Sequence, residues 1–392
     1  MPLNAVDRDS ALLLLVAGAK GAVGSTIAVS VAGLKEDPGA RIAGLTTADK
    51  FAFLGPVVQI ELAGWDTDRR ILPATIDHHG VVPTVVWRRW NQRLTAMDIR
   101  LAPSADLSLG RQVEALRKDM QDFKRLYPYA RAVLINLLPA SQDFKLPHRP
   151  MTLKALLEQS PDGPPDLAYA AAAVLEGIPV INFTPNAIEI EALCKAAREA
   201  GAPLAGRDGK TGQTYFKVVL ASAFKARGLK VDGWYSLNIL GNADGKNLMD
   251  PDRSRGKLRN KTRLLDDLLG YEVGQAGGQS AHKVRIDYYP PRGDAKEAWD
   301  VIDFSGLLDL PMSMRVNLQG RDSILAAPMA IDLARWVAAL QLAGRGGPIA
   351  ELGFFFKRPV GSRPPLTFQD QLACLDRLED QINARLDPAR VQ

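Results

Sequence analysis

The chain has 392 residues, of which 46% are apolar, and its 49 basic and 44 acidic residues give a net charge of +5. This length accommodates two domains, or one large domain with an insertion, and the apolar content is ordinary for a folded protein. The apolar content argues against a disordered chain. The net positive charge weakly favours an anionic ligand, but the basic residues are scattered among acidic neighbours, which argues against a nucleic-acid-binding protein.

The two cysteines, Cys194 and Cys374, are too few for a disulfide framework and stand in no CxxC motif, so we expect buried thiols in a reducing compartment. The apolar run at residues 11–19 is too short to span a bilayer, and Asp7 and Asp9 before it are atypical of a secretory signal. We therefore expect a soluble, cytoplasmic protein with no membrane partner.

The first predicted elements form a βαβ unit. Residues 11–16 are a short, continuous apolar run, which is typical of a strand buried on both faces of a parallel sheet. Residues 25–34 have the apolar spacing of a helix, and residues 41–45 are predicted to be the second strand. This order of elements is how a parallel α/β sheet begins.

Helices and strands continue to alternate up to about residue 200. Predicted helices at residues 109–127 and 166–176 each precede a short apolar run ended by proline, at residues 130–140 and 177–185. Residues 145–165 carry five prolines and are predicted to be a surface excursion. The alternation predicts an α/β fold with a doubly wound parallel sheet.

The pattern of the sequence changes after Gly206. Residues 283–290 alternate between polar and apolar side chains, which indicates antiparallel strands with one solvated face. Residues 324–342 are predicted to be a long apolar helix, and residues 351–359 another buried strand.

Three glycines follow the first predicted strand at the spacing G-x-x-G-x-x-G: Gly18, Gly21 and Gly24. Glycine permits a tight turn and the close approach of a pyrophosphate to the N-terminus of the next helix, where free N–H groups favour negative charge. In a βαβ unit this arrangement predicts a dinucleotide site. Near its end the predicted second strand offers no acidic residue before Asp49 and no arginine, so these residues leave the choice between NAD and NADP open.

Residues 206–215, GRDGKTGQTY, are predicted to form a phosphate-binding loop. The nucleoside-triphosphate pattern G-x-x-x-x-G-K-[ST] would end at Gly209, Lys210 and Thr211, and it would need glycine in place of Leu204. The sequence therefore favours a phosphate other than that of ATP.

Five stretches farther along the chain complete a pattern with this loop: SLNILGNADGKNL (236–248), RGKLRNKTRLLDD (255–267), GDAKEAWD (293–300), RDSILAAP (321–328) and FFFKRP (354–359). In this order and at these spacings they resemble the myo-inositol-phosphate synthase family, and the chain length resembles its short archaeal and bacterial members. The resemblance is clear from about Ala168 to Pro359 and thinner before.

The resemblance implies a Rossmann-type NAD-binding domain, residues 1–205 and 316–392, interrupted by a catalytic domain with an antiparallel sheet, residues 206–315, that assembles a homotetramer. It also implies conversion of glucose 6-phosphate to myo-inositol 1-phosphate. The steps would be oxidation at C5 by NAD, enolisation, aldol closure between C6 and C1, and re-reduction that regenerates NAD. Whether a divalent or monovalent cation takes part is left open.

The family's site residues carry over position by position. Its substrate-phosphate loop matches Thr211, Gly212, Gln213 and Thr214. Its catalytic groups match Lys257, Lys261, Lys296, Lys357, Asp208 and Asp322. Its cofactor-binding positions match Gly18, Gly21, Ala22, Val23, Gly24, Asn238 and Asp244, and its nicotinamide and substrate pocket matches Leu240 and Asn242. Two departures, Ala243 and Tyr215, remove no catalytic group.

The lysines suit this chemistry because an alkoxide, an enolate and an aldolate each need a cation aimed at a developing oxyanion. Each residue type also has a purely structural reading. Helical lysines such as Lys257 and Lys261 are usually solvated, Asp322 fits a helix cap, and Asp208 and Asp244 fit turns. A charge at Lys357, after a buried strand, is harder to explain in this way.

Two other functions stay open on the sequence. One is a cyclase that acts on another sugar phosphate, such as fructose 6-phosphate. The other is a plain NAD(P)-dependent dehydrogenase, which would accumulate the reduced cofactor. The four histidines, His78, His79, His148 and His282, show no metal-binding spacing.

Overall fold

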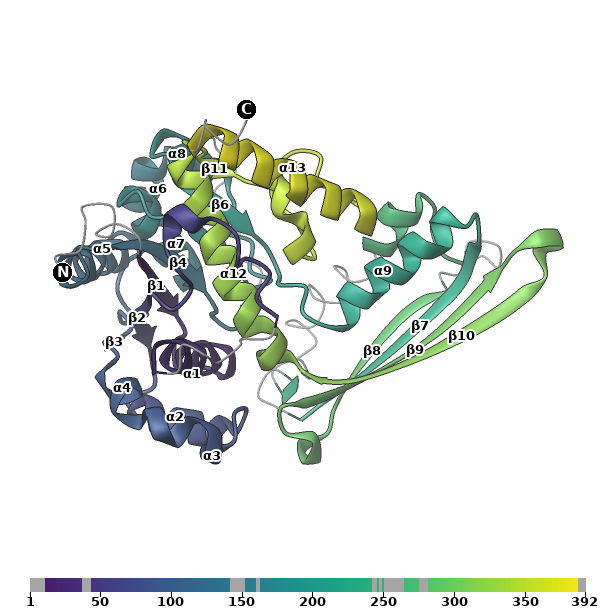
Figure 1. Cartoon of the computed structure of the whole chain (residues 1–392), viewed down its shortest axis with the longest axis horizontal. Helices are drawn as coiled ribbons and strands as arrows, with labels where there is room; N and C mark the ends of the chain where they lie inside the picture. The colour runs from purple at the N-terminus through teal and green to yellow at the C-terminus, as the bar shows by residue number, and fades with distance from the viewer. Residues whose placement is uncertain are drawn as a thin grey trace.

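The computed structural model describes residues 11–36, 44–141, 152–159, 163–241, 245–246, 249, 264–274 and 281–386. Two β-sheets, separated along the long axis of the molecule, organise this part of the chain (Figure 1). The first is parallel, in the order β11-β6-β5-β4-β1-β2-β3, which is the Rossmann order with one short edge strand added. Its strands are β1 (Ala11–Ala17), β2 (Ile60–Asp66), β3 (Ile99–Leu101), β4 (Ala130–Asn136), β5 (Val180–Asn182), β6 (Pro203–Gly206) and β11 (Gly347–Pro348).

Helices cover both faces of the first sheet. One face packs against α1 (Ala22–Glu36) and α12 (Asp322–Leu342). The other packs against α5 (Leu109–Leu126), α6 (Leu153–Gln159), α7 (Pro165–Leu175) and α8 (Glu191–Glu199). Beyond α1 lie α2 (Leu72–His79), α3 (Thr84–Trp87), α4 (Asn91–Ala96) and the 3-10 turn η3 (Arg88–Trp90), whereas the 3-10 turn η2 (Ala52–Leu54) packs against α12 (Figure 1). The doubly wound parallel sheet predicted from the sequence is confirmed.

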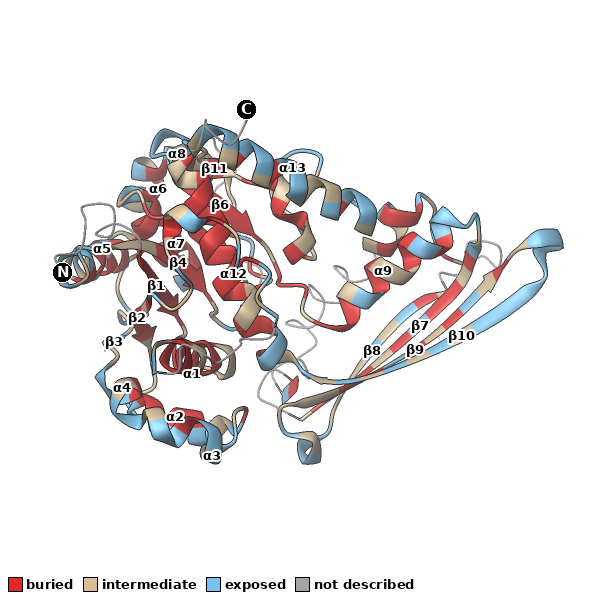
Figure 2. Ribbon diagram, viewed as in Figure 1, coloured by how far each residue is buried: buried red, intermediate tan, exposed pale blue. Residues whose placement is uncertain are grey.

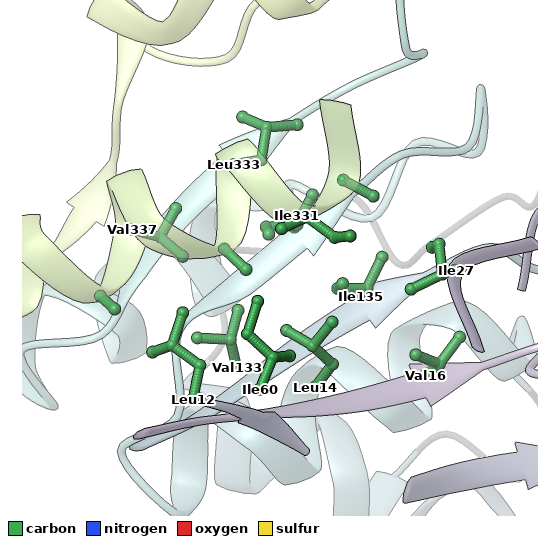
Figure 3. Packing of buried hydrophobic residues seen from close by; sticks show 14 of the residues in the cluster. Leu12, Leu14, Val16, Ile27, Ile60, Val133, Ile135, Ile331, Leu333 and Val337 are labelled. Carbon is green, nitrogen blue, oxygen red and sulfur yellow. The ribbon is translucent and has the colours of Figure 1, made fainter. Parts of the chain in front are cut away.

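Strand β1 explains why its apolar run is continuous. Leu12, Leu14 and Val16 belong to the hydrophobic core on the α1 and α12 face, as Figure 3 shows. Leu13 and Leu15 alternate with them and belong to the core on the opposite face. Because successive side chains of a strand point to opposite faces, a strand buried on both sides needs an apolar residue at every position.

The predicted second strand at residues 41–45 is wrong in its described part. Gly44 and Leu45 are not in a strand, residues 41–43 lie outside the described residues, and the strand beside β1 is β2. The loop here is tied to α12 instead, because the Asp332 carboxylate accepts hydrogen bonds of 2.6 to 2.9 Å from the N–H and hydroxyl groups of Thr46 and Thr47. This contact with a side chain distant in sequence holds the chain at Thr46 and Thr47, just after the predicted strand, and no local sequence pattern shows it.

The second sheet has the order β10-β9-β7-β8, with β7 (Lys230–Leu240), β8 (His282–Tyr288), β9 (Ala295–Ser305) and β10 (Pro311–Arg321). It is mixed rather than antiparallel, because β8 runs parallel to β7 while β9 pairs antiparallel with β7 and β10. The connection at residues 241–281 is long enough for the crossover that a parallel pair needs. The 3-10 turns η5 (Pro290–Arg292) and η6 (Leu307–Asp309) flank β9.

One face of the second sheet is covered by α9 (Gln213–Ala226) and a helical segment at residues 264–269. In Figure 1 this sheet and α9 lie at the end of the molecule remote from β1, and α12 leads back from β10 to the first sheet. The C-terminal helix α13 (Phe368–Leu386) packs against both α9 and the 3-10 turn η7 (Ala350–Phe355).

Two further expectations need correction. Residues 351–359 are not a buried strand: η7 is helical, and only Phe356 forms a single bridge with Gly209. Residues 145–165 are not wholly a surface excursion, since Leu153 and Leu156 of α6 are buried in the core, although residues 142–151 and 160–162 lie outside the described residues.

The predicted helix at residues 324–342 is confirmed as α12. In the described part of the chain, α12 alone has the length and mean hydropathy of a membrane-spanning helix, and 78% of its most apolar window is buried inside the fold. A core helix has the same properties, so they are weak evidence for a membrane span.

Candidate active site

The glycine turn and the 206–215 loop border one cavity of about 570 Å³. It lies beyond the carboxyl ends of the parallel strands, where α/β folds bind their ligands. Residues after β4, β5 and β6 line it, as do the first residues of α1 and α12. The predicted site residues that line it are Gly18, Gly21, Ala22, Val23, Gly24, Asp208, Thr211, Asp322 and Lys357.

The glycine turn has the shape that a dinucleotide requires. Gly18 has a φ of +85°, and a Cβ at Gly24 would lie 2.4 Å from the carbonyl oxygen of Gly18, so only glycine fits at Gly24. The turn delivers the N-terminus of α1 to the cavity, where backbone N–H groups are free to bind an anion. These residues fit a bound pyrophosphate.

An acidic residue that the sequence analysis missed ends β2. The Asp66 carboxylate accepts hydrogen bonds from the backbone N–H of Lys20, at 2.8 Å, and of Asp68, at 2.9 Å. In a Rossmann fold the acid at the end of the second strand is the one that meets the adenosine ribose. The sequence does contain a signal for Asp66, since the largely apolar segment of β2 ends at this residue. With the second strand expected at residues 41–45, the nearest acidic residue was instead Asp49.

Lys357 and Asp208 form an ion pair beside the cavity, with Nζ 2.6 Å from Oδ1 and both side chains largely buried. Two paired backbone segments bring them together: the N–H of Lys357 donates to the Asp208 carbonyl, and the N–H of Arg207 donates to the Arg358 carbonyl, each at 2.8 Å. The other carboxylate oxygen of Asp208 has no hydrogen-bond partner among the described residues. A buried acceptor without a partner is a candidate to receive a ligand hydroxyl.

Lys296 and Asp322 form a second pair, with Nζ 3.0 Å from Oδ2. Thr211 approaches the same carboxylate, its hydroxyl donating to Oδ1 at 3.3 Å. Asp322 is the first residue of α12, and its side chain does not cap that helix. The capping alternative is therefore wrong, and the carboxylate joins Thr211 of the 206–215 loop to Lys296 of the second sheet.

The loop Thr211, Gly212, Gln213 and Thr214 surrounds the N-terminus of α9, with Gly212 at the capping position. Of the four, Thr211 alone lines the described cavity. The Gln213 side chain turns the other way and donates from Nε2 to Asp300 Oδ2 at 2.8 Å. The loop thus presents a hydroxyl and a helix N-terminus, which together suit an anion.

Two predicted residues lie on β7. Asn238 is completely buried, and neither its amide nitrogen nor its amide oxygen has a hydrogen-bond partner among the described residues. It pairs with Ala298 of β9, two positions from Lys296, so Asn238 and Lys296 share one face of the sheet. Leu240 is buried on that face. Asn242, Ala243, Asp244, Lys257 and Lys261 lie outside the described residues.

Two buried lysines were not singled out from the sequence. Burial, with a contribution from nearby Lys357, lowers the pKa of Lys210 to about 7. Burial lowers the pKa of Lys217 to about 8, against the opposing effect of Asp300. Lys217 donates to the Ser236 hydroxyl at 3.0 Å, and that hydroxyl donates to Asp300. No cluster of three or more metal-ligating side chains occurs among the described residues.

The chain is similar to known proteins both in sequence and in structure. Residues 212–323 match the family model for myo-inositol-1-phosphate synthase. The chain is 39% identical over 298 residues to inositol-3-phosphate synthase 1 of Bacteroides thetaiotaomicron, a match that covers 74% of this chain and 66% of that protein. It is 30% identical over 236 residues to inositol-3-phosphate synthase 1 of Oryza sativa subsp. japonica, a match that covers 57% of this chain and 45% of that protein.

Among solved structures, the inositol-3-phosphate synthase of Caenorhabditis elegans has the same fold, with a TM-score of 0.82 and 20% identity over 95% of this chain and 86% of that one. The sequence matches thus span two thirds or less of the length of the two curated relatives, whereas the structural match covers nearly all of this chain. The sequence match and the fold agree, and the chain belongs to the myo-inositol-1-phosphate synthase family.

Proposed function

We propose that this protein converts glucose 6-phosphate into a myo-inositol monophosphate, with NAD as a cofactor that is reduced and reoxidised within each cycle. The observation that carries the proposal is the single cavity bordered by both the glycine turn and the ion pair of Lys357 and Asp208. A dinucleotide and a sugar phosphate that share this space would have their reacting atoms next to each other.

In the nucleotide part of the proposal, the turn from Gly18 to Gly24 binds the pyrophosphate of the cofactor and Asp66 binds the adenosine ribose. A carboxylate at the ribose favours NAD, because it would repel the 2′-phosphate of NADP. When bound, NAD would accept a hydride from C5 of the sugar and return it at the end of the cycle. Asn238 and Leu240 are proposed to border the nicotinamide, together with Asn242 and Asp244.

In the phosphate part of the proposal, the N-terminus of α9 binds the phosphate group of the substrate. Free N–H groups of the first helical turn, and the Thr211 hydroxyl once it turns from Asp322 to the ligand, would hold the substrate phosphate through charge-assisted hydrogen bonds. Gly212 permits the close approach, while Gln213 and Thr214 complete the loop. Binding through a helix terminus leaves the lysines free for the reacting carbons.

In the chemical part of the proposal, the lysines stabilise the negative charge that develops on the substrate during the reaction. Lys357 and Lys296 are each held by a carboxylate, so their remaining N–H groups point in set directions. They would stabilise the oxygens at C5 and C1 as enolisation and ring closure proceed. The unpartnered oxygen of Asp208 would accept a substrate hydroxyl. Lys257 and Lys261 are proposed as further cations of the same kind.

We further propose that residues 206–315 form the inserted catalytic and assembly domain of a cytoplasmic homotetramer, with residues 1–205 and 316–392 as the NAD-binding domain. The uncovered face of the second sheet supports assembly. On it Tyr235 and Trp299 are 39% and 45% exposed, although aromatic side chains of this size are usually buried.

The experiment that tests the function is incubation of the purified protein with glucose 6-phosphate and NAD, followed by identification of the product by nuclear magnetic resonance. An inositol monophosphate without accumulation of NADH is expected. NADH formed in proportion to sugar consumed would identify a dehydrogenase instead. A carbocycle formed only when fructose 6-phosphate replaces glucose 6-phosphate would keep the reaction class and overturn the substrate.

A further inference from the structure

Lys210 has no part in the proposed chemistry, yet it lies between two residues of the site. Its neighbours Gly209 and Thr211 line the cavity, and Lys210 does not. The Lys210 side chain is 2% exposed, which is rare for lysine. Its ammonium group therefore serves something behind the site rather than a ligand within it.

The partners of this ammonium are neutral groups from two other segments. Nζ of Lys210 donates to Oε1 of Gln371 at 2.8 Å and to the Gly353 carbonyl at 3.3 Å. It also lies 5.9 Å from the centre of the Phe354 ring, within cation–π range. Gln371 belongs to α13, and the other two residues belong to η7. Lys210 thus joins the phosphate loop, η7 and the C-terminal helix at one point.

The Gln371 amide is oriented for this contact. Its Nε2 donates to the carbonyl oxygens of Pro365 and Leu366, at 3.3 and 3.1 Å. Both N–H donors are thereby used, and Oε1 is the atom that remains to face Lys210. The hydrogen bond between Lys210 and Gln371 is therefore built into the fold.

A buried ammonium without a carboxylate partner weakens the fold. Burial disfavours the charged form, and the pKa of Lys210 is lowered to about 7 for this reason and through the charge of Lys357. An apolar side chain of similar length would usually be neutral or stabilising at such a position. Residues that destabilise a fold locally are concentrated at functional sites.

The backbone connects Lys210 to the ion pair. The N–H of Lys210 donates to the Phe355 carbonyl, and the N–H of Lys357 donates to the Asp208 carbonyl, each at 2.8 Å. Residues 208–210 and 355–357 therefore form one short ladder. The ion pair of Asp208 and Lys357 lies beside the cavity, and the Lys210 ammonium attaches the ladder to α13.

We propose that Lys210 is a positioning residue for Lys357 and Asp208, and that α13 supports the active site through the hydrogen bond between Gln371 and Lys210. The rate measurements that follow rest on the proposed function. The contact itself is also tested without them.

The first test compares Lys210→Met and Gln371→Met with a control, Gln341→Met. Gln341 makes a similar tie, from Nε2 to the Gly177 carbonyl at 2.7 Å, in a part of α12 far from the cavity. Lys210→Met and Gln371→Met should each lower kcat about tenfold or more, because small displacements of catalytic groups are costly, with a smaller change in KM for glucose 6-phosphate. NAD affinity should stay unchanged, and the control should turn over like the parent. A kcat equal to that of the parent in both Lys210→Met and Gln371→Met would overturn the proposal.

The double variant Lys210→Met with Gln371→Met separates this role from two unrelated defects. If the two residues act through one hydrogen bond, the double variant loses no more rate than either single variant. Rate losses that multiply would overturn the shared role. Should Lys210→Met fail to fold, Gln371→Met, which removes only the acceptor, decides the matter alone.

Hydrogen exchange of α13 distinguishes failure of this inference from failure of the proposed function. If the parent makes no inositol monophosphate, the function is wrong, but the contact between Lys210 and Gln371 still predicts faster amide exchange in α13 of Gln371→Met than of Gln341→Met, because the buried ammonium loses its acceptor. Equal exchange rates in the two variants would show that the hydrogen bond between Lys210 and Gln371 does not hold α13 in place, whatever reaction the protein catalyses.

Discussion

The first sheet is covered by helices on both faces, whereas the second sheet is covered on one face only (Figure 2). The side chains of β1 are apolar on both faces, and buried polar groups such as Asn136 and Asn182 lie at the carboxyl ends of β4 and β5. Under the covered face of the second sheet, by contrast, Asp300 accepts hydrogen bonds from Gln213, Trp234 and Ser236, and Lys217 joins the network.

The difference separates stability from function. Apolar burial on two faces makes the first sheet a rigid support whose strand ends hold the glycine turn. The second sheet carries buried polar groups, which cost stability unless they are satisfied but orient the N-terminus of α9 through Gln213. The candidate site lies where these two regions meet, and the predictions below alter one region while measuring the other.

The largest effect on stability is expected in the first sheet. Leu14→Ala removes a fully buried side chain from the centre of β1 and should lower the free energy of unfolding by about 2 to 5 kcal/mol. Urea unfolding measures it. Leu307→Ala, at a position that is 86% exposed on the second sheet's hairpin, is the control and should change stability by less than about 0.5 kcal/mol. Equal losses in the two variants would contradict the contrast between the sheets.

The largest effect on turnover is expected where the regions meet. Lys357→Met should lower kcat about a hundredfold or more, because it removes a preorganised cation from the site. It also leaves the buried Asp208 carboxylate without its partner. The double variant with Asp208→Asn is therefore measured as well, because it removes that unpaired charge. Exposed Lys195→Met is the control. A double variant that folds and retains most of the turnover would show Lys357 to be structural.

A smaller effect is expected on binding alone. Thr211→Val keeps the shape of the side chain and removes its hydroxyl, and a hydrogen bond to a charged group contributes about 1.5 to 3 kcal/mol. Affinity for glucose 6-phosphate should therefore fall about tenfold or more, with NAD affinity unchanged. Calorimetric titration with each ligand checks both. Weaker NAD binding with unchanged sugar-phosphate binding would assign the loop to the dinucleotide.

The buried polar network should give stability a dependence on pH. Because burial lowers the pKa of Lys217 from 10.5 to about 8, the unfolded chain binds more protons than the folded protein between these values. The destabilisation is complete below pH 8 and disappears as pH rises toward 10.5. The parent should gain up to about 1.4 kcal/mol per pH unit over Lys217→Met in this window. A stability difference independent of pH would show that Lys217 stays charged when folded.

The smallest effect on the stability of one chain is expected on the uncovered face. Trp299→Glu adds a charge to an exposed position and should change the unfolding free energy by about 0.5 kcal/mol or less. If this face is where copies of the chain associate, sedimentation should instead show a smaller assembly. An unchanged sedimentation coefficient would place the assembly surface elsewhere.

Elements with strong local periodicity were predicted from the sequence. The helices at residues 109–127 and 166–176 were found as α5 and α7, and the long helix at residues 324–342 as α12, because their apolar spacing arises from contacts along one helix face. The glycine turn was predicted for a similar reason, since Gly18 has a positive φ and the atoms nearest a Cβ at Gly24 belong to Gly18 and Ala19.

Pairings between distant segments were not predictable in this way. The predicted second strand is followed by a loop that Asp332, almost three hundred residues later in the chain, holds at Thr46 and Thr47, and the strand that pairs with β1 is β2. The orientation of β8 depends on its crossover rather than on its alternating pattern. Asp66 was missed for the same reason, because its position is informative only once Asp66 is known to be the last residue of β2.

The sequence by itself determined the fold class, the position of the glycine turn and the residue types of the site, because periodicity, glycine spacing and motif order are properties of short segments. Tertiary structure alone decided that Lys357 would meet Asp208, that Lys296 would meet Asp322, and that the Gln213 amide would turn toward Asp300. It also decided that Lys210 would be buried against α13. The pKa of a lysine and the direction of an amide are set by burial and by partners far along the chain, and these exist only after the chain has folded.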